Sequence, residues 1–164
     1  RRRGECGAAL AACRVAGVEV ADLAGVPEPE LERLRAGMPA VLHRRLTHVV
    51  RESARTRAAA MALSVRDYPK FGEYLVEGHR SIRDDFESSC GEADRLVESA
   101  VRHGAWGARL TGAGWGGAVL VMAPPDRLAS LTSGVSADFR REVGRAPRVW
   151  KARAAAGVRG ERAG

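Results

Sequence analysis

Five glycines crowd into one short stretch of the chain, at Gly107, Gly112, Gly114, Gly116 and Gly117. Glycine tolerates positive φ angles, and successive backbone N–H groups in turns of this kind can converge on an anion, typically a phosphate. The same glycines also suit a tight turn that only lets two buried strands pack closely. The stretch therefore indicates either a phosphate-contacting loop or a structural turn.

Three of these glycines fit the G-x-G-x-x-G pattern of dinucleotide-binding folds, at Gly112, Gly114 and Gly117. In those folds the glycines follow a strand and open a helix, whose N-terminus holds the pyrophosphate. Here they precede a short apolar run over 118–123 that two prolines end, which predicts a buried strand. The order strand, loop, strand therefore argues against a dinucleotide fold.

Few other residues suggest chemistry. His79 lies on the apolar face of an expected helix, and we interpret it as a core histidine with satisfied hydrogen bonds rather than a catalytic group. Asp84 and Asp85 next to Arg83 could form a carboxylate pair, but adjacent residues point in different directions on a helix. We therefore expect these three residues to be surface charges.

The three cysteines, Cys6, Cys13 and Cys90, form no C-x-x-C pair and have no histidine at metal-ligand spacing. We expect them to be small buried apolar residues, and we predict neither a disulfide nor a zinc site. No residue of the chain is predicted as a metal ligand or as a general base.

Length and composition suit one globular domain. The chain has 164 residues, of which 45% are hydrophobic and 29% charged. No apolar run approaches the ~20 residues that a membrane-spanning helix needs, and Arg1, Arg2 and Arg3 are not followed by the apolar stretch of a signal peptide. We expect a soluble, cytoplasmic protein without a membrane partner.

The net charge of +7 is concentrated near the C-terminus. Residues 139–164 hold eight basic and two acidic residues, whereas 58–138 hold eight basic and eleven acidic residues. Such a tail could neutralise nucleic-acid phosphates, but no aromatic residues alternate with its arginines for base stacking. We expect 153–164 to be a solvated, disordered Gly/Arg tail, and nucleic acid to be an unlikely partner.

Apolar residues recur at helical spacing in most of the chain. This spacing predicts helices over 1–13, about 28–36, about 42–63, from Tyr68 with Asp67 as its N-cap, about 92–102, and from Pro125 onward. In the helix over 42–63 the expected inward positions are Leu42, Leu46, Val49, Ser53, Thr56, Ala60 and Leu63. In the helix from Tyr68 they are Tyr68, Phe71, Leu75, His79, Ile82 and Phe86. In the helix over 92–102 they are Leu96, Val97, Ala100 and Val101, and in the helix from Pro125 they are Leu128, Leu131, Val135 and Phe139.

Short strands are predicted near 106–110, 118–122 and 148–152. Helices that precede and follow a few strands indicate an α+β fold, with helices packed on a small, mainly antiparallel sheet. We expect one domain over 1–152.

Three ordered segments carry a family resemblance. GARLTGAGWGG at 107–117 resembles the C-terminal motif of the GHMP small-molecule kinases, most closely the galactokinase form G-[AS]-R-M-T-G-G-G-F-G-G. HRSIRDDFESSCGEAD at 79–94 and RRLTHVVRESAR at 44–55 resemble two further galactokinase segments, and the opening RRRGEC resembles the helix that enters the family's second half. Among the differences, Ala113 stands where the motif has glycine, and its Cβ restricts the loop backbone.

The resemblance implies a GHMP-kinase C-terminal domain with a ferredoxin-like α/β layer. It also implies an enzyme that uses ATP and Mg²⁺ to phosphorylate α-D-galactose to galactose 1-phosphate. The residues that it implies for ATP binding are Thr111, Gly112, Ala113, Gly114, Trp115, Gly116 and Gly117. We expect Arg109, which precedes the loop, to form a structural ion pair.

The chain contains no segment similar to the sugar signature, the Ser/Gly-rich phosphate loop or the catalytic aspartate of a galactokinase's first half. It also begins inside an expected helix. We therefore expect the C-terminal half of a galactokinase, inactive alone and partnered by a missing N-terminal half. The alternatives are a stand-alone non-catalytic domain with a regulatory or partner-binding role, and a nucleic-acid binder acting through its tail.

Overall fold

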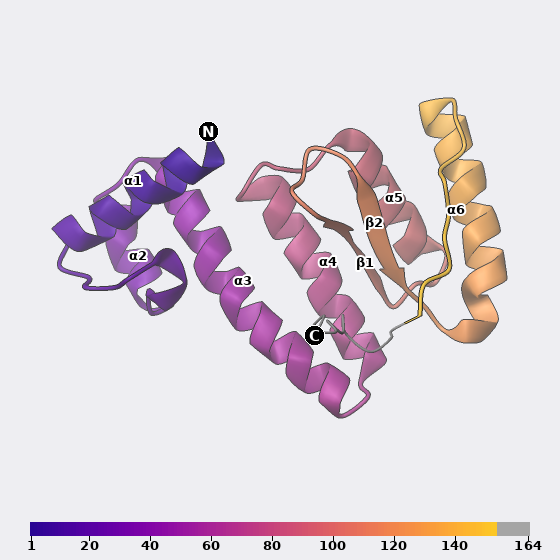
Figure 1. Cartoon of the computed structure of the whole chain (residues 1–164), viewed down its shortest axis with the longest axis horizontal. Helices are drawn as coiled ribbons and strands as arrows, with labels where there is room; N and C mark the ends of the chain where they lie inside the picture. Colours follow the sequence, from indigo (N-terminus) through magenta and orange to yellow (C-terminus); the bar gives the residue numbers. More distant parts are fainter. Residues whose placement is uncertain (154–164) are drawn as a thin grey trace, which may run out of the picture.

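The structure is a computed structural model that describes residues 1–153 (Figure 1). Its helices are α1 (Arg2–Val15), η1 (Leu23–Gly25), α2 (Glu30–Arg35), α3 (Ala40–Ser64), α4 (Tyr68–Asp84), α5 (Gly91–Arg102), η2 (Pro125–Arg127) and α6 (Leu128–Val143). Its strands are β1 (Gly107–Thr111) and β2 (Ala118–Met122). The predicted α+β fold, rich in helix and with a small antiparallel sheet, is confirmed.

β1 and β2 form an antiparallel hairpin whose register pairs Gly107 with Met122 and Thr111 with Ala118. Side chains alternate between the two faces of a strand, so one face of the hairpin collects its apolar residues. That face packs against α5 and α6 in a core of Val97, Ala100, Ala108, Leu131 and Val135, with Val119 and Val121 at its border. The hairpin and two helices thus form the C-terminal layer of the fold.

Helix α4 covers the outer edge of β1. The backbone N–H of Leu110 donates to Nδ1 of His79 at 3.2 Å, so this edge is satisfied by a helix side chain instead of a neighbouring strand. Nearby, Gly72 of α4 approaches the backbone of Trp106 and Gly107 so closely that no Cβ would fit. The predicted N-cap of α4 is confirmed, because the Asp67 carboxylate accepts from the backbone N–H of Lys70 at 3.0 Å.

The N-terminal third has a separate apolar core. Helices α1, η1 and α2 pack on the first turns of α3 through Ala9, Cys13, Val18, Leu23, Val26, Leu31, Leu34, Met38, Leu46 and Val50. Figure 1 shows the resulting order across the molecule: α1 and α2, then α3, α4, the hairpin with α5, and α6 at the opposite end. Helix α3 is therefore buried from two sides over its first half.

A buried arginine joins these layers. The side chain of Arg45 is 0% exposed, and its Nε donates to Glu5 of α1 at 2.6 Å while its Nη2 donates to Glu87 at 2.5 Å. Its Nη1 donates to the carbonyl oxygen of Asp85. The hydrogen bond from Arg45 is the main cause that lowers the pKa of Glu5 to about 2. The segment after α4 is thereby fixed to α1 and α3 by charge.

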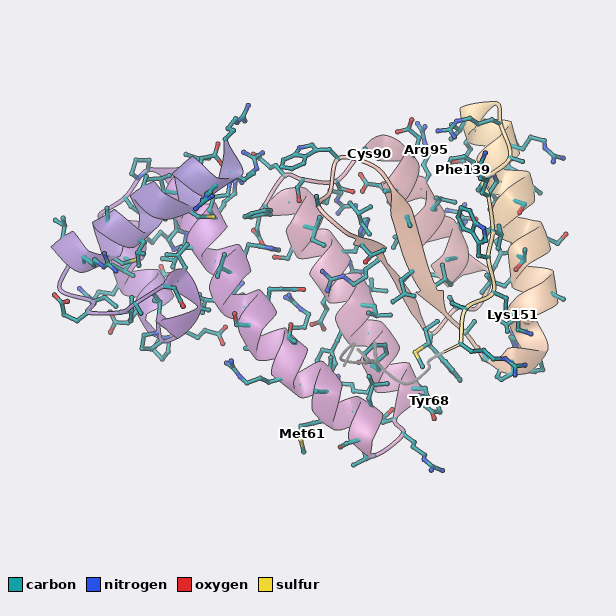
Figure 2. All side chains as sticks on the ribbon, in the orientation of Figure 1. Met61, Tyr68, Cys90, Arg95, Phe139 and Lys151 are labelled. Atoms are coloured by element: carbon teal, nitrogen blue, oxygen red, sulfur yellow. The ribbon has the colours of Figure 1, made fainter. Side chains whose placement is uncertain are left out.

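Two sequence predictions are wrong in detail. No strand forms over 148–152, where Val149 and Trp150 are 53% and 72% exposed; in the part of the chain that the structure describes, no strand pairs with this segment. Several positions expected to point inward are exposed instead: Thr56, Ala60, Leu63, Tyr68 and Val101. The end of α3 extends past the helices that cover its first half, and Met61 there points away from the molecule (Figure 2).

The remaining apolar stripes agree better with prediction. Leu131, Val135 and Phe139 of α6 are buried, and Phe139 lies on the side of α6 that faces α5 (Figure 2). Cys13 is buried, as predicted, and Cys6 and Cys90 are half-buried; all three are free thiols. The tail beyond Arg153 lies outside the described residues, so its expected disorder stays a prediction.

Candidate functional site

The glycine-rich segment forms the loop between β1 and β2, as the sequence predicts, but β2 is only partly buried, with Leu120 48% exposed, and so is not the buried strand expected over 118–123. Positive φ angles occur at Gly112 (89°), Gly114 (91°), Gly116 (128°) and Gly117 (99°), but not at Ala113. Ala113 therefore has a conformation that a residue with a Cβ readily adopts, and its replacement of glycine costs the loop nothing in geometry. The alternation of φ sign from Gly112 to Gly114 is typical of backbone nests that bind anions.

Ser88 holds the tip of this loop. The backbone N–H of Trp115 donates to the carbonyl oxygen of Ser88 at 2.6 Å. A Cβ at Gly114 would lie 2.5 Å from the same oxygen, so only glycine allows this approach. Trp115 itself has a φ of 54°, which is unfavourable for a bulky residue, and its side chain is 59% exposed. The connection between α4 and α5 thus holds the loop in a strained shape.

Most N–H groups of the loop remain available. Among the described residues, no hydrogen-bond acceptor is found for the backbone N–H groups of Gly112, Ala113, Gly114, Gly116 and Gly117. Backbone N–H groups rarely stay without an acceptor unless they face water or a ligand. The loop can therefore donate several hydrogen bonds to one anion.

A pocket of about 270 Å³ opens beside the loop. Its walls come from α3, α4, the α4–α5 connection, β1 and the loop: His48, Ile82, Phe86, Ser88, Arg109, Leu110, Thr111, Gly112, Ala113 and Gly114. Of the predicted ATP-binding residues, Thr111 to Gly114 thus line the pocket, whereas Trp115, Gly116 and Gly117 lie outside it. A concave site in which several polar groups converge is a candidate for small-molecule binding.

Arg109 forms the structural ion pair that the sequence predicts, and it also lines the pocket. Its Nη1 donates to Glu52 of α3 at 2.6 Å, and Gly78 of α4 leaves room for the guanidinium. Burial by itself raises the pKa of Glu52, but its hydrogen bonds and ion pairs with Arg109 and Arg55 outweigh burial and lower the pKa. Arg109 is therefore anchored as a cation at the pocket wall.

His79 belongs to the core, as predicted, and not to the pocket. Its Nδ1 accepts from Leu110, and its Nε2 donates to Asp94 at 3.1 Å, so both ring nitrogens have partners. Burial lowers the pKa of His79 despite the opposing effect of Asp94. Arg83 pairs with Asp84 at the surface, whereas Asp85 turns inward and accepts a hydrogen bond from Ser81. The expectation of surface charges is thus wrong for Asp85.

His48 is a pocket residue that the sequence analysis missed. Its ring stacks on Phe86 with centroids 4.5 Å apart, and its Nδ1 lies 3.0 Å from the Ser81 hydroxyl. Burial lowers the pKa of His48. The only sequence signal was its place in the segment 44–55, which resembles a galactokinase segment without indicating what this residue contacts.

The pocket does not offer a magnesium site. Its walls contain no carboxylate, which is the usual protein ligand of Mg²⁺, and Glu52 nearby is occupied by two arginines. Over residues 1–153, no three His, Cys, Asp or Glu side chains cluster as metal ligands would. These residues therefore do not fit the ion. Nor does any helix in the same range have the length and apolar character to cross a membrane.

Comparison with known proteins shows which family the chain is similar to. The family model "GHMP kinases C terminal" matches residues 58–141. The galactokinase of Streptomyces coelicolor is 38% identical over 95% of this chain and 41% of its own length, and the human galactokinase is 48% identical over 58% of this chain and 25% of its own.

A solved structure of Lactococcus lactis galactokinase complexed with galactose superposes with a TM-score of 0.84 at 30% identity, covering 88% of this chain and 38% of that one. The chain thus spans well under half of these relatives, and corresponds mostly to their C-terminal part. With a family model that covers residues 58–141 and a fold shared with a galactokinase, the chain belongs to the GHMP kinases as a C-terminal domain of that family.

Proposed function

We propose that this chain is the C-terminal part of a galactokinase. Joined to an N-terminal half, it takes part in transfer of the γ-phosphoryl group of ATP to the anomeric hydroxyl of α-D-galactose, which yields galactose 1-phosphate and ADP. The similarity to galactokinases over nearly the whole chain supports this function. The observation that carries it is the strained glycine loop at the rim of a pocket, with several N–H groups that find no acceptor among residues 1–153.

The proposed role of the loop is to position phosphate. Phosphoryl transfer depends mainly on alignment of donor and acceptor and on stabilisation of charge on the phosphoryl oxygens. Backbone N–H groups of Gly112, Ala113 and Gly114, which line the pocket, would donate to those oxygens, and the Arg109 guanidinium would add a positive charge at the wall. Donors that are already oriented do not have to reorganise during the reaction.

The remaining chemistry belongs to the missing half. ATP with Mg²⁺ is the phosphoryl donor that the family uses, and the carboxylates that hold Mg²⁺ would lie outside the residues described. The same holds for the general base and for most groups that recognise the sugar. A cytoplasmic location is part of this proposal and rests on the resemblance to galactokinases.

Activity of the chain alone and in a chimera tests the proposal. We expect no galactose-dependent ADP release from the 164-residue chain, because the substrates stay unplaced without a nucleotide loop. A chimera with the N-terminal part of the Streptomyces coelicolor galactokinase, which is 38% identical in the shared region, should release ADP when galactose is added. The matched control is that N-terminal part alone.

Two results would contradict the proposal. One is galactose-dependent ADP release by the chain alone that persists through further purification. The other is a folded chimera without activity, which would favour the stand-alone, non-catalytic domain with a regulatory or partner-binding role.

A further inference from the structure

Three side chains form a hydrogen-bonded row that ends at the pocket. Asp85 follows the end of α4, Ser81 lies in its last turns, and His48 projects from α3. The Ser81 hydroxyl donates to Asp85 Oδ2 at 2.8 Å, and Ser81 Oγ lies 3.0 Å from His48 Nδ1. Ser81 and His48 are both buried, which keeps water from competing for these bonds.

The row fixes which ring nitrogen of His48 carries the proton. A serine hydroxyl has one hydrogen, and Ser81 donates it in the hydrogen bond to Asp85, since a carboxylate can only accept. Ser81 Oγ can then only accept from His48, so the hydrogen must be on Nδ1. In a neutral imidazole the other nitrogen, Nε2, therefore has a lone pair and no hydrogen.

Nε2 is left for a ligand. In the described part of the chain it has no hydrogen-bond partner, and it is not among the fully enclosed polar atoms. The His48 ring lines the pocket, and stacking on Phe86 fixes the plane of the ring. Burial lowers the pKa of His48, which keeps the ring neutral at pH 7 and above. The pocket wall thus offers an acceptor at a defined position.

We propose that His48 Nε2 accepts a hydrogen bond from a hydroxyl group of the ligand bound in this pocket. This inference rests on the proposed function for the identity of that ligand, a polyhydroxy compound such as the sugar or the ribose of ATP. Ser81 and Asp85 are positioning residues that hold the required tautomer. A fully ionised phosphate has no hydrogen to donate, and its oxygens would be repelled by the Nε2 lone pair.

The pocket is consequently divided into two kinds of wall. His48 presents an acceptor for hydroxyl groups, whereas Arg109 and the loop N–H groups present donors for oxygen atoms. Arg109 Nη1 is occupied by Glu52, but its Nη2 has no partner among residues 1–153. A ligand with both hydroxyl groups and a phosphate fits this division better than either group alone.

The tautomer can be measured without any ligand. Long-range ¹H–¹⁵N NMR spectra of the chain at pH 8 should show His48 with hydrogen on Nδ1. His43, which also lies on α3 but contacts the Leu31 carbonyl oxygen, is the internal control. Ser81→Ala should return His48 to the tautomer with hydrogen on Nε2, and Ser81→Thr should restore the original one. A wild-type His48 with hydrogen on Nε2 would overturn the proposal.

Ligand titrations then identify the hydroxyl source. Galactose, ATP and inorganic phosphate are added separately to the chain and to the chimera described above. A shift of His48 Nε2 with galactose indicates the sugar, and one with ATP indicates the ribose. His48→Phe keeps a ring against Phe86 and should weaken binding of that ligand about five- to tenfold, the loss expected for one neutral hydrogen bond.

The outcomes for the two proposals differ. No His48 response to galactose or ATP in either protein, or a response to phosphate only, contradicts the role of His48. Absence of ADP release from the folded chimera contradicts the proposed function, and it leaves the tautomer of His48 and its ligand response as separate measurements.

Discussion

Gly72 of α4 and Gly107 of β1 lie in backbone contact, and a Cβ on either residue would overlap the other segment. This contact brings α4 against the edge of β1, where His79 can reach Leu110. Gly72→Ala should therefore lower the free energy of unfolding by about 1–3 kcal/mol or more, because backbone must move to admit the methyl group. Urea unfolding followed by circular dichroism measures the change.

The matched control for that substitution is Gly7→Ala in α1. No atom lies within 4 Å of a Cβ at Gly7, so the change should stabilise the protein by about 0.5–1 kcal/mol through helix propensity. If Gly72→Ala also raises the free energy of unfolding, the close packing of α4 on β1 is refuted.

His79 replaces a neighbouring strand at the edge of β1, so its loss leaves the backbone N–H of Leu110 without an acceptor. His79→Leu removes that acceptor and one of the two donors to Asp94, which keeps the Ser89 hydroxyl. A buried N–H left unpaired in this way should cost about 1–3 kcal/mol of stability. His103→Ala is the control, because His103 is exposed and its partner Asp138 keeps other donors; it should cost about 0.5 kcal/mol. Equal losses would contradict the edge role.

Much of this fold follows from local sequence patterns. The helices and the hairpin were predictable because apolar spacing, the Asp67 cap and the glycines act over a few residues. The prediction of a strand over 148–152 is wrong because a strand depends on non-local pairing. It needs the edge of a neighbouring strand, and no local pattern reveals whether such an edge is free.

Only part of the candidate site could be predicted from the sequence. The glycine loop and the ion pair of Arg109 could be predicted, but the buried Arg45 and the row from Asp85 to His48 could not. The expected inward stripe of α3 did not include Arg45 or His48, whereas α3 is covered on two sides and buries both; the partners of Arg45 are about forty positions away. Such pairings depend on the packing of helices and leave no periodic signal.

Arg45 should be one of the most sensitive polar positions of the fold. Arg45→Ala removes the fully buried partner that Glu5 and Glu87 share, although Arg1, Arg2 and Arg44 still pair with the two carboxylates, and should cost about 1–3 kcal/mol. NMR titration should also find the pKa of Glu5 well above its native value of about 2. Arg51→Ala breaks an exposed pair with Glu28 and should cost about 0.5 kcal/mol or less. A similar effect of both substitutions would show that Arg45 does not join the layers.

Two buried histidines predict a loss of stability in mild acid. Burial lowers the pKa of His48 and of His79 in the folded chain, whereas in the unfolded chain both titrate near ~6.5. Below that pH the unfolded state binds more protons, so stability should fall as pH decreases from about 6.5 toward the folded pKa values. Urea unfolding at pH 5 and pH 8 measures the slope, and His79→Gln should reduce it. A free energy of unfolding that is higher at pH 5 than at pH 8 would contradict the neutral, buried state of these rings.

Gly114 is the position where the loop is most tightly held. Gly114→Ala places a Cβ 2.5 Å from the Ser88 carbonyl oxygen and should displace the loop from its anchor. In the chimera, a displacement of about 1 Å should lower kcat/KM for galactose by about 100-fold, because the reaction depends on alignment of the phosphate. Ala113→Gly is the control: Ala113 has no positive φ, so activity should stay within about threefold. Equal activity of Gly114→Ala and wild type would exclude a role of the anchored loop in placing phosphate.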